Sequence, residues 1–228
     1  MISFGSGQPD LPPPAEAYRI LPEYKDFKYG LIQGQENLRS ALALQYHHHK
    51  DQFIITNGAS EALDLVCRFL KTKGDYILLP RPYYYSYPYN ARYANLKVKF
   101  YDLEDGKINV DNFETNLKGC VAVIINSPSN PTGSVQEIDT LKTIEIMVQN
   151  SGAYIISDEV YKDLIYEREN YTFKGDHIIT INSFSKTFAM CGFRVGYLYS
   201  NDQEVIDACL AMKTHTSMNG LVLQIESD

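Results

Sequence analysis

The sequence predicts an α/β protein with a mostly parallel sheet flanked by helices. Short runs rich in Val, Ile and Leu alternate with longer amphipathic segments, as in strands joined by crossover helices. Several of the short runs are apolar without interruption, which is typical of strands buried on both faces. The chain has 228 residues, of which 44% are hydrophobic and 21% charged, so it can build a core of ordinary globular composition.

Each expected strand is a short apolar run that ends at a turn. The expected strands are residues 53–56, 76–79, 98–101, 121–125, 154–157, 178–181 and 195–199. Pro80 and Pro82 should end the second of these strands, because proline cannot donate a hydrogen bond to a neighbouring strand.

Helices are expected where apolar residues recur at helical spacing. The expected helices are residues 35–46, 61–71, 84–93, 134–149 and 204–212. Ser134 and Glu137 have the spacing of a capping box, which predicts that the fourth helix begins there. Three histidines, at positions 47 to 49, follow the first helix. Adjacent side chains point in different directions, so we expect no metal site among them.

Composition and charge exclude several classes of protein. A net charge of −7 and a pI near 5.3 argue against nucleic acid or anionic lipid as the main partner. No apolar run reaches the length of a membrane span, and the first residues lack the features of a signal peptide. The four cysteines, Cys67, Cys120, Cys191 and Cys209, are scattered and favour reduced core thiols. We therefore expect a cytoplasmic protein.

Four polar motifs follow predicted strands. They occupy residues 58–60, 126–133, 158–161 and 183–186. In open sheets of this class, ligands bind outside the carboxyl ends of the strands. The four motifs are therefore expected to form one site.

A lysine that closely follows two serines is the central feature of this expected site. Ser183 and Ser185 precede Lys186, and Arg194 follows eight residues later with a planar fork of donors. These groups suit a phosphate held beside an amine. The alternative is a surface lysine in a serine-rich turn, because short motifs also match by chance.

A turn at the start of the second predicted helix adds backbone donors. The amides of Gly58, Ala59 and Ser60 open that helix, and helix N-termini bind phosphate. A phosphate cup beside a potentially nucleophilic lysine suggests pyridoxal 5'-phosphate, whose aldehyde forms a Schiff base with lysine.

Four other side chains would contact the ring of such a cofactor. Asp158 ends an apolar strand, where a carboxylate needs a cationic partner such as a protonated pyridine nitrogen. Asn130 and Tyr161 would hydrogen-bond the phenolic oxygen of the ring, and Tyr84 would stack on its face. The alternatives are a helix N-cap for Asp158, a common Asn-Pro turn, and a core cluster of aromatic residues.

These motifs, in this order, resemble the fold-type I, class I/II pyridoxal-phosphate-dependent aminotransferases. Within that family the sequence is most similar to the branch of prokaryotic aspartate aminotransferases. The matching segments cover almost the whole chain and are residues 4–10, 29–39, 56–63, 82–87, 126–133, 157–161, 183–188 and 192–197.

The resemblance implies a role for each residue. Lys186 would form the Schiff base and move the proton between Cα of the substrate and C4' of the cofactor. Asp158 would pair with the pyridinium, Asn130 and Tyr161 would hold the ring oxygen, and Tyr84 would stack. The phosphate would be held by Ser183, Ser185, Arg194 and the turn at Gly58, Ala59 and Ser60.

The resemblance also implies an assembly and a division of the chain. Tyr29 would reach the phosphate of a neighbouring subunit in a homodimer, and Gly7 would lie at the substrate carboxylate. Residues 1–34 would be an N-terminal arm, and residues 35–228 the cofactor-binding large domain. The family's C-terminal small domain carries an arginine that binds the substrate's α-carboxylate, and no residue here matches it. The chain would be either a truncated product or a protein without that half.

The implied function is transfer of an amino group from an amino acid to a 2-oxo acid. Two alternatives stay open. The same site could serve a lyase or decarboxylase, because the lysine and the aspartate do not determine which bond breaks. The chain could also be a catalytically silent, dimeric fragment that binds the cofactor.

Overall fold

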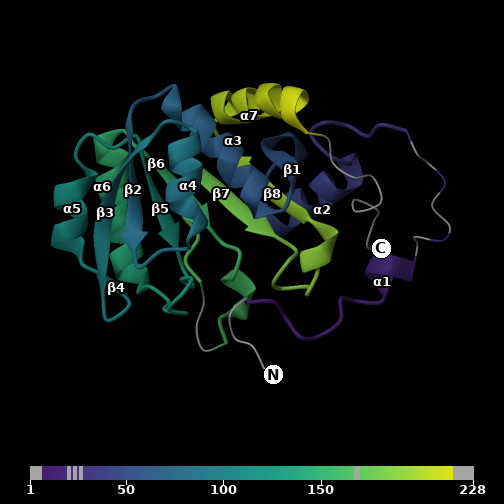
Figure 1. Ribbon diagram of the computed structural model, residues 1–228, viewed down its shortest axis with the longest axis horizontal. Coiled ribbons are helices and arrows are strands. Elements are labelled where there is room, and N and C mark those ends of the chain that lie inside the picture. The colour runs from purple at the N-terminus through teal and green to yellow at the C-terminus, as the bar shows by residue number, and fades with distance from the viewer. Residues whose placement is uncertain (1–6, 20–21, 23–24, 26–27, 167–169, 218–228) are drawn as a thin grey trace.

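The computed structural model describes residues 7–19, 22, 25, 28–166 and 170–217, which form one mixed sheet with helices on both sides (Figure 1). The strands are β1 (Phe53–Asn57), β2 (Tyr76–Arg81), β3 (Lys97–Glu104), β4 (Lys107–Ile108), β5 (Ala122–Asn126), β6 (Tyr154–Asp158), β7 (Ile178–Ser183) and β8 (Val195–Ser200). The helices are α1 (Glu16–Arg19), α2 (Glu36–Tyr46), α3 (Ala59–Lys71), α4 (Ser86–Tyr93), α5 (Val110–Leu117), α6 (Ile138–Ser151) and α7 (Gln203–Thr216). Short 3-10 turns are η1 (Lys50–Gln52), η2 (Lys162–Leu164) and η3 (Cys191–Phe193).

The sheet has the order β1-β8-β7-β6-β5-β2-β3-β4. The central pairs β7–β6, β6–β5, β5–β2 and β2–β3 are parallel, which confirms the predicted mostly parallel sheet. The β8 strand is antiparallel to both β7 and β1. Its direction was not predicted. Only residues 184–194 link β7 to β8, and a parallel crossover needs about a dozen residues or more, usually with a helix.

Alternate residues of the strands enter cores on opposite faces of the sheet. In β2, Ile77 and Leu79 join one apolar cluster, whereas Leu78 joins another. The first cluster lies under α3, α4 and α7, which Figure 1 shows together on one side of the sheet. The opposite face is covered by α5 and α6 over the centre and by α2 over β1 and β8. Both faces are therefore buried, as continuous apolar strands require.

The predicted capping box at Ser134 and Glu137 is wrong. The α6 helix begins at Ile138, and Glu137 precedes it without a side-chain capping bond. The Ser134 hydroxyl instead bonds the hydroxyl of Thr132 nearby. Gln136 ties the segment to β4 and the turn before it: its side chain accepts a hydrogen bond from the amide of Ile108 and donates one to the carbonyl of Gly106. These tertiary contacts hold the backbone outside the helix.

Two further expectations need correction. The β2 strand continues through Pro80 to Arg81, because β5 pairs only with Ile77 and Leu78 and leaves that edge of β2 open beyond them. Of the four cysteines, three are buried core thiols, but Cys191 is half-buried and its thiol donates to the carbonyl of Ser185 at 3.0 Å. The α5 helix and the β4 strand were not predicted.

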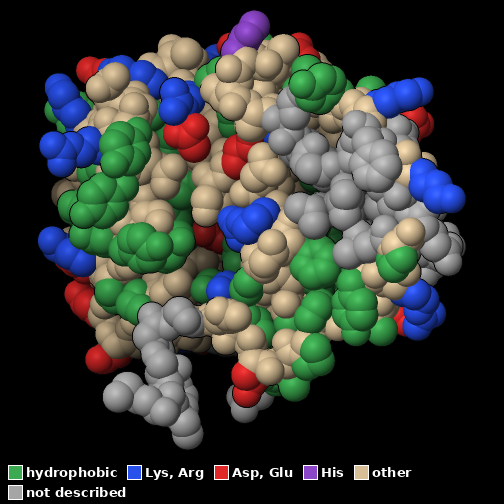
Figure 2. Space-filling view, turned by 45° about the vertical axis from the view of Figure 1, so that its right-hand side comes forward, with side chains coloured by type: hydrophobic (Ala, Val, Ile, Leu, Met, Phe, Trp, Pro, Cys, Tyr) green, Lys and Arg blue, Asp and Glu red, His purple; other side chains and the backbone are tan. Residues whose placement is uncertain are grey.

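Within the described ranges, none of the helices has both the length and the apolar character needed to cross a membrane. The space-filling view shows basic, acidic and hydrophobic side chains interspersed over one face (Figure 2).

Candidate active site

The polar motifs meet because three neighbouring parallel strands end side by side. Asn126, Asp158 and Ser183 are the last residues of β5, β6 and β7. The register pairs Asn126 with Asp158, and Ser183 with Gly196 of β8. The short link from β7 to β8 then carries Lys186 and Arg194 over this same edge of the sheet.

Lys186 lies between the N-terminal segment and Tyr161. Its Nζ donates a hydrogen bond to the carbonyl oxygen of Gly7 at 2.7 Å and lies 6.0 Å from the centroid of the Tyr161 ring. A Cβ atom on Gly7 would be 3.9 Å from the Tyr161 hydroxyl. The structure thus brings together three of the predicted site residues that are far apart in the sequence.

A chain of amide hydrogen bonds orients Tyr161. Asn130 donates from Nδ2 to the Tyr161 hydroxyl at 3.2 Å, and the amide of Asn130 donates to Asn126 Oδ1 at 2.7 Å. Asn126 in turn donates to the carbonyl of Asp158 at 3.1 Å. Burial, followed by the nearby charge of Asp158, raises the pKa of Tyr161, so the phenol stays protonated and can donate.

The carboxyl group of Asp158 is desolvated, and both of its hydrogen-bond donors are neutral. The Tyr87 hydroxyl donates to Oδ2 at 2.6 Å, and the amide of Val160 donates to Oδ1 at 3.2 Å. Burial raises the pKa of Asp158, although these two hydrogen bonds oppose the shift. The carboxylate would therefore gain from a cation placed beside it.

Tyr87, which bonds Asp158, is the residue of this region that sequence reasoning did not select. It is fully buried in α4, three residues after Tyr84, and the two rings meet edge to face with centroids 5.5 Å apart. Tyr84 itself is half-buried and precedes α4. The spacing of three residues within a predicted helix was the available signal, because such residues share a face.

A glycine turn lies against the guanidinium of Arg194. Gly58 has φ +74°, and a Cβ there would come within 2.4 Å of Arg194 Nη2. Arg194 donates to the carbonyls of Cys191 at 3.0 Å and Asn57 at 3.4 Å. A Cβ on Gly196 would be 2.5 Å from the carbonyl carbon of Gly58, so the turn packs directly on β8. Only glycines permit this approach.

Two buried serines lie next to this turn. Ser183 is paired with Gly196 in the sheet, and its hydroxyl accepts a hydrogen bond from the amide of Ser185 at 3.4 Å. Ala59 and Ser60 are the first two residues of α3. The predicted phosphate-binding groups therefore gather around the start of α3.

Tyr29 is not part of this cluster. Its side chain is 90% exposed. A role toward a neighbouring subunit needs an exposed side chain, and that role stays a prediction.

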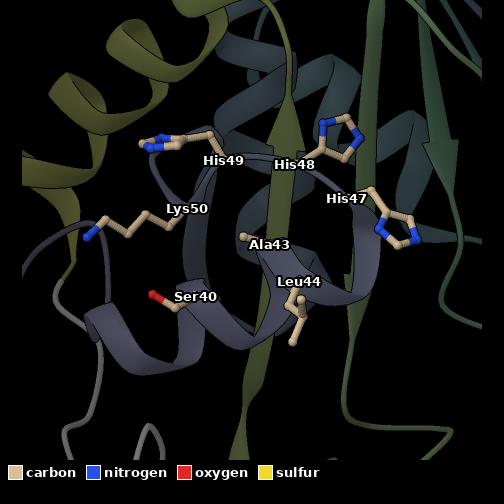
Figure 3. A pocket seen from close by; sticks show the side chains of 7 residues that line it. All are labelled: Ser40, Ala43, Leu44, His47, His48, His49 and Lys50. Carbon is tan, nitrogen blue, oxygen red and sulfur yellow. The ribbon is translucent and has the colours of Figure 1, made fainter.

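A separate shallow pocket lies at the end of α2. Its volume is about 390 Å3, and its lining includes His47, His48, His49 and Lys50. Figure 3 shows the three imidazole rings pointing away from one another. Within the described residues, no group of three or more His, Cys, Asp or Glu side chains is arranged to hold a metal ion. None of the predicted site residues lines this pocket.

The sequence identifies the class of protein. Residues 1–225 match the family model described as aminotransferase class I and II, so the chain belongs to that family. It is 36% identical over 215 residues to a probable aspartate aminotransferase of Methanocaldococcus jannaschii, covering 89% of this chain and 57% of the relative. It is 32% identical to the aspartate aminotransferase of Thermotoga maritima, covering 95% of this chain and 62% of the relative.

Solved structures show the same fold. An aspartate aminotransferase from Thermus thermophilus with maleate matches with a TM-score of 0.90 at 27% identity, covering 96% of this chain and 62% of that one. The Thermotoga maritima enzyme matches with a TM-score of 0.87 at 32% identity, covering 96% of this chain and 64% of that one. The chain thus spans 57–62% of the length of these two curated relatives.

Proposed function

We propose that this chain provides the cofactor-binding part of a pyridoxal-phosphate-dependent aminotransferase, which transfers an amino group from an amino acid to a 2-oxo acid. One observation carries the proposal. A lysine amine, a desolvated carboxylate with neutral partners, and an arginine packed on a glycine turn lie at one edge of the sheet. The curated relatives named as aspartate aminotransferases support the same reaction class.

The residues fit pyridoxal 5'-phosphate in charge and in shape. Gly58, at φ +74°, brings the turn against the guanidinium of Arg194, so a positive charge lies next to the backbone amides at the start of α3. A dianionic phosphate is the kind of ligand that such a combination binds. At the other end of the site, Asp158 would supply the negative charge that a protonated ring nitrogen needs.

Each side chain then has a defined task. When bound, the cofactor supplies a carbonyl group that reacts with amines and a ring that accepts electrons. Lys186 would hold the cofactor and, when released, move a proton at Cα of the substrate. Asp158 would keep the ring nitrogen protonated. Tyr161 and Asn130 would hold the ring oxygen, and Tyr84 would orient the ring.

The phosphate would be held by the turn at Gly58, Ala59 and Ser60 together with the side chains of Ser183, Ser185 and Arg194. Gly7, whose carbonyl accepts from Lys186, would border the substrate carboxylate. We infer that residues 1–34 act as an arm beside the large domain formed by residues 35–228.

We further infer that the protein works as a homodimer in the cytoplasm. Tyr29 is 90% exposed and Leu31 57% exposed, so the segment before α2 presents apolar surface that a second subunit would cover. Tyr29 would then reach the phosphate of the partner's cofactor. The substrates would be amino acids and 2-oxo acids, with no nucleic acid or membrane involved.

Chemical labelling tests the proposal directly. The protein, expressed from its complete reading frame, is saturated with pyridoxal 5'-phosphate, reduced with borohydride and digested. The label is expected on the peptide that contains Lys186, and Lys186→Arg should abolish it while keeping the positive charge. Lys162→Arg serves as the control, because Lys162 is half-buried in an ion pair with Glu159.

Incubation with amino acids and 2-oxo acids completes the test. Stoichiometric exchange of amino groups is expected. A label on another lysine would contradict the assignment of Lys186, and release of CO2 or of an eliminated side chain instead of exchange would contradict transamination.

A further inference from the structure

A buried ion pair joins the last turn of α7 to the first turn of α3. Lys213 is fully buried, and its Nζ donates to Glu61 Oε1 at 2.9 Å, to Glu61 Oε2 at 3.0 Å and to the Ser217 hydroxyl at 3.2 Å. All three hydrogens of the ammonium group therefore have acceptors. The Ser217 hydroxyl also donates to Glu61.

Glu61 also bonds Asn57, the residue that precedes Gly58. Its Oε2 accepts from the backbone amide of Asn57 at 2.5 Å and from Asn57 Nδ2 at 3.1 Å. The carbonyl of Asn57 accepts from Arg194 at 3.4 Å. Both backbone groups of Asn57 are thus fixed, one by Glu61 and the other by Arg194.

Burial opposes the charge on Glu61, but the hydrogen bonds from Ser217, Asn57 and Lys213 outweigh it. Together they lower the pKa of Glu61, so this carboxylate is ionised at neutral pH. An ionised carboxylate beside the turn would repel a phosphate unless a cation neutralised it. Lys213 supplies that cation.

The two helices are tied at both ends, but only one tie touches the turn. Lys73, just after α3, pairs with Glu204 at the start of α7 at 2.5 Å. Lys213, at the end of α7, pairs with Glu61 at the start of α3. The helices therefore run antiparallel. Lys73 provides a matched control for Lys213, because it joins the same helices far from the turn.

We propose that Glu61 and Lys213 are positioning residues that fix the turn at Asn57 and Gly58 and neutralise its surroundings, so that the end of α7 sets the affinity for the cofactor phosphate. This inference rests on the proposed function, because it takes that turn as the phosphate site. Neither residue would touch the reacting atoms.

Binding of pyridoxal 5'-phosphate and of pyridoxal, which lacks the phosphate, tests the inference. Lys213→Met should weaken binding of pyridoxal 5'-phosphate about tenfold, because the charge of Glu61, no longer neutralised, would repel the phosphate. Binding of pyridoxal should stay within about twofold, since a positioning effect on the phosphate turn does not reach the ring. Lys73→Met should change neither.

Two double variants keep the test decisive if Lys213→Met does not fold. Glu61→Gln with Lys213→Met removes both charges but retains an acceptor for the Asn57 amide. Glu61→Leu with Lys213→Met removes the charges and the acceptor. The double variant with Glu61→Gln should bind pyridoxal 5'-phosphate nearly as the wild type does. The double variant with Glu61→Leu should bind it about tenfold more weakly. Hydrogen exchange of the Asn57 amide in the cofactor-free protein should be faster only in the double variant with Glu61→Leu.

The outcomes separate this inference from the proposed function. Equal affinities of the two double variants for pyridoxal 5'-phosphate would overturn the positioning role. So would a variant in which binding of pyridoxal weakens as much as binding of pyridoxal 5'-phosphate. A wild-type protein that binds pyridoxal 5'-phosphate no better than pyridoxal would overturn the proposed phosphate site, and with it this inference.

Discussion

Two half-buried carboxylates, at opposite ends of the candidate site, differ in how their charge is balanced. Glu61 accepts hydrogen bonds from Lys213, Ser217 and Asn57, and its pKa is lowered. Among the described residues, a phenol and a backbone amide donate to Asp158, and its pKa is raised by burial. The first group has a cationic partner within the chain, whereas the second would gain from a cation supplied by a ligand. The contrast suggests which carboxylate serves the fold and which serves the chemistry.

The largest expected effect follows from removing the charge of Asp158. We expect Asp158→Asn to fold but to lose at least ~10²-fold in the rate of Cα proton exchange, because each pKa unit lost at the ring nitrogen corresponds to about a factor of ten. Exchange of amino-acid protons into D2O, followed by NMR, measures this rate. Asp163→Asn is the control, since Asp163 is also in the region after β6 but contacts Thr187. Wild-type rates in Asp158→Asn would show that Asp158 does not serve the ring.

The two carboxylates should also affect stability in opposite directions. Glu61→Gln leaves Lys213 as an uncompensated buried cation and should destabilise the protein by about 3–5 kcal/mol at pH 7. Because the folded-state pKa of Glu61 is lowered, its stabilising contribution is present above the unfolded value of 4.5 and is lost as pH falls through the folded value.

For Asp158, ionisation has the opposite effect on the stability of the folded protein. Its raised folded-state pKa means that ionisation destabilises the cofactor-free protein as pH rises above the unfolded value of 3.8. Asp158→Asn should therefore raise the melting temperature of the cofactor-free protein at pH 7, by ~2–4 °C per kcal/mol gained in a domain of this size. Thermal unfolding between pH 4 and pH 8 compares both variants. A lower melting temperature for Asp158→Asn at pH 7 would contradict the proposed difference between the two carboxylates.

A smaller effect is expected at the hydroxyl that supports Asp158. Tyr87→Phe removes the 2.6 Å hydrogen bond and should reduce proton exchange about tenfold, as expected for a hydrogen bond to a charged group. The affinity for the cofactor phosphate should change little, because Tyr87 lies at the ring end. Kinetics of exchange and a binding titration separate the two. Tyr101→Phe is the control, since its buried hydroxyl donates to the carbonyl of Ile124 instead. An equal loss in both variants would point to a general packing defect.

The smallest expected effect concerns Tyr29. If it reaches the phosphate in a partner subunit, Tyr29→Phe should weaken cofactor retention severalfold, about the value of one hydrogen bond, without abolishing the dimer. Sedimentation and dialysis against buffer measure the two properties. Tyr18→Phe is a matched control, because Tyr18 is also exposed. A wild-type protein that is monomeric and still retains the cofactor fully would refute a site shared between two subunits.

The sequence alone was sufficient to predict those features that a local pattern of residues determines. Apolar runs located the central strands, and the polar residues that follow them, such as Asp158 and Lys186, were expected to meet because parallel strands end at one edge. The roles of these residues at a bound cofactor stay predictions.

Long-range contacts were not accessible in the same way. The bond from Tyr87 to Asp158 and the pair of Glu61 with Lys213 each join residues that only the packing of helices on the sheet brings together. The same limit explains the error at Ser134, where contacts of Gln136 with β4 and the turn before it outweighed a local capping signal. Sequence spacing identified candidates for chemistry but not the side chains that support them.

The protonation state of the cofactor ring tests the central claim most directly. Wild-type protein and Asp158→Asn are loaded with pyridoxal 5'-phosphate that carries 15N in its ring, and the nitrogen chemical shift is followed from pH 6 to pH 9. A ring nitrogen that stays protonated throughout in the wild type but not in Asp158→Asn is the result we predict, because the buried carboxylate stabilises the cation. The same unprotonated shift in both proteins would contradict the assignment of Asp158 as the partner of the ring.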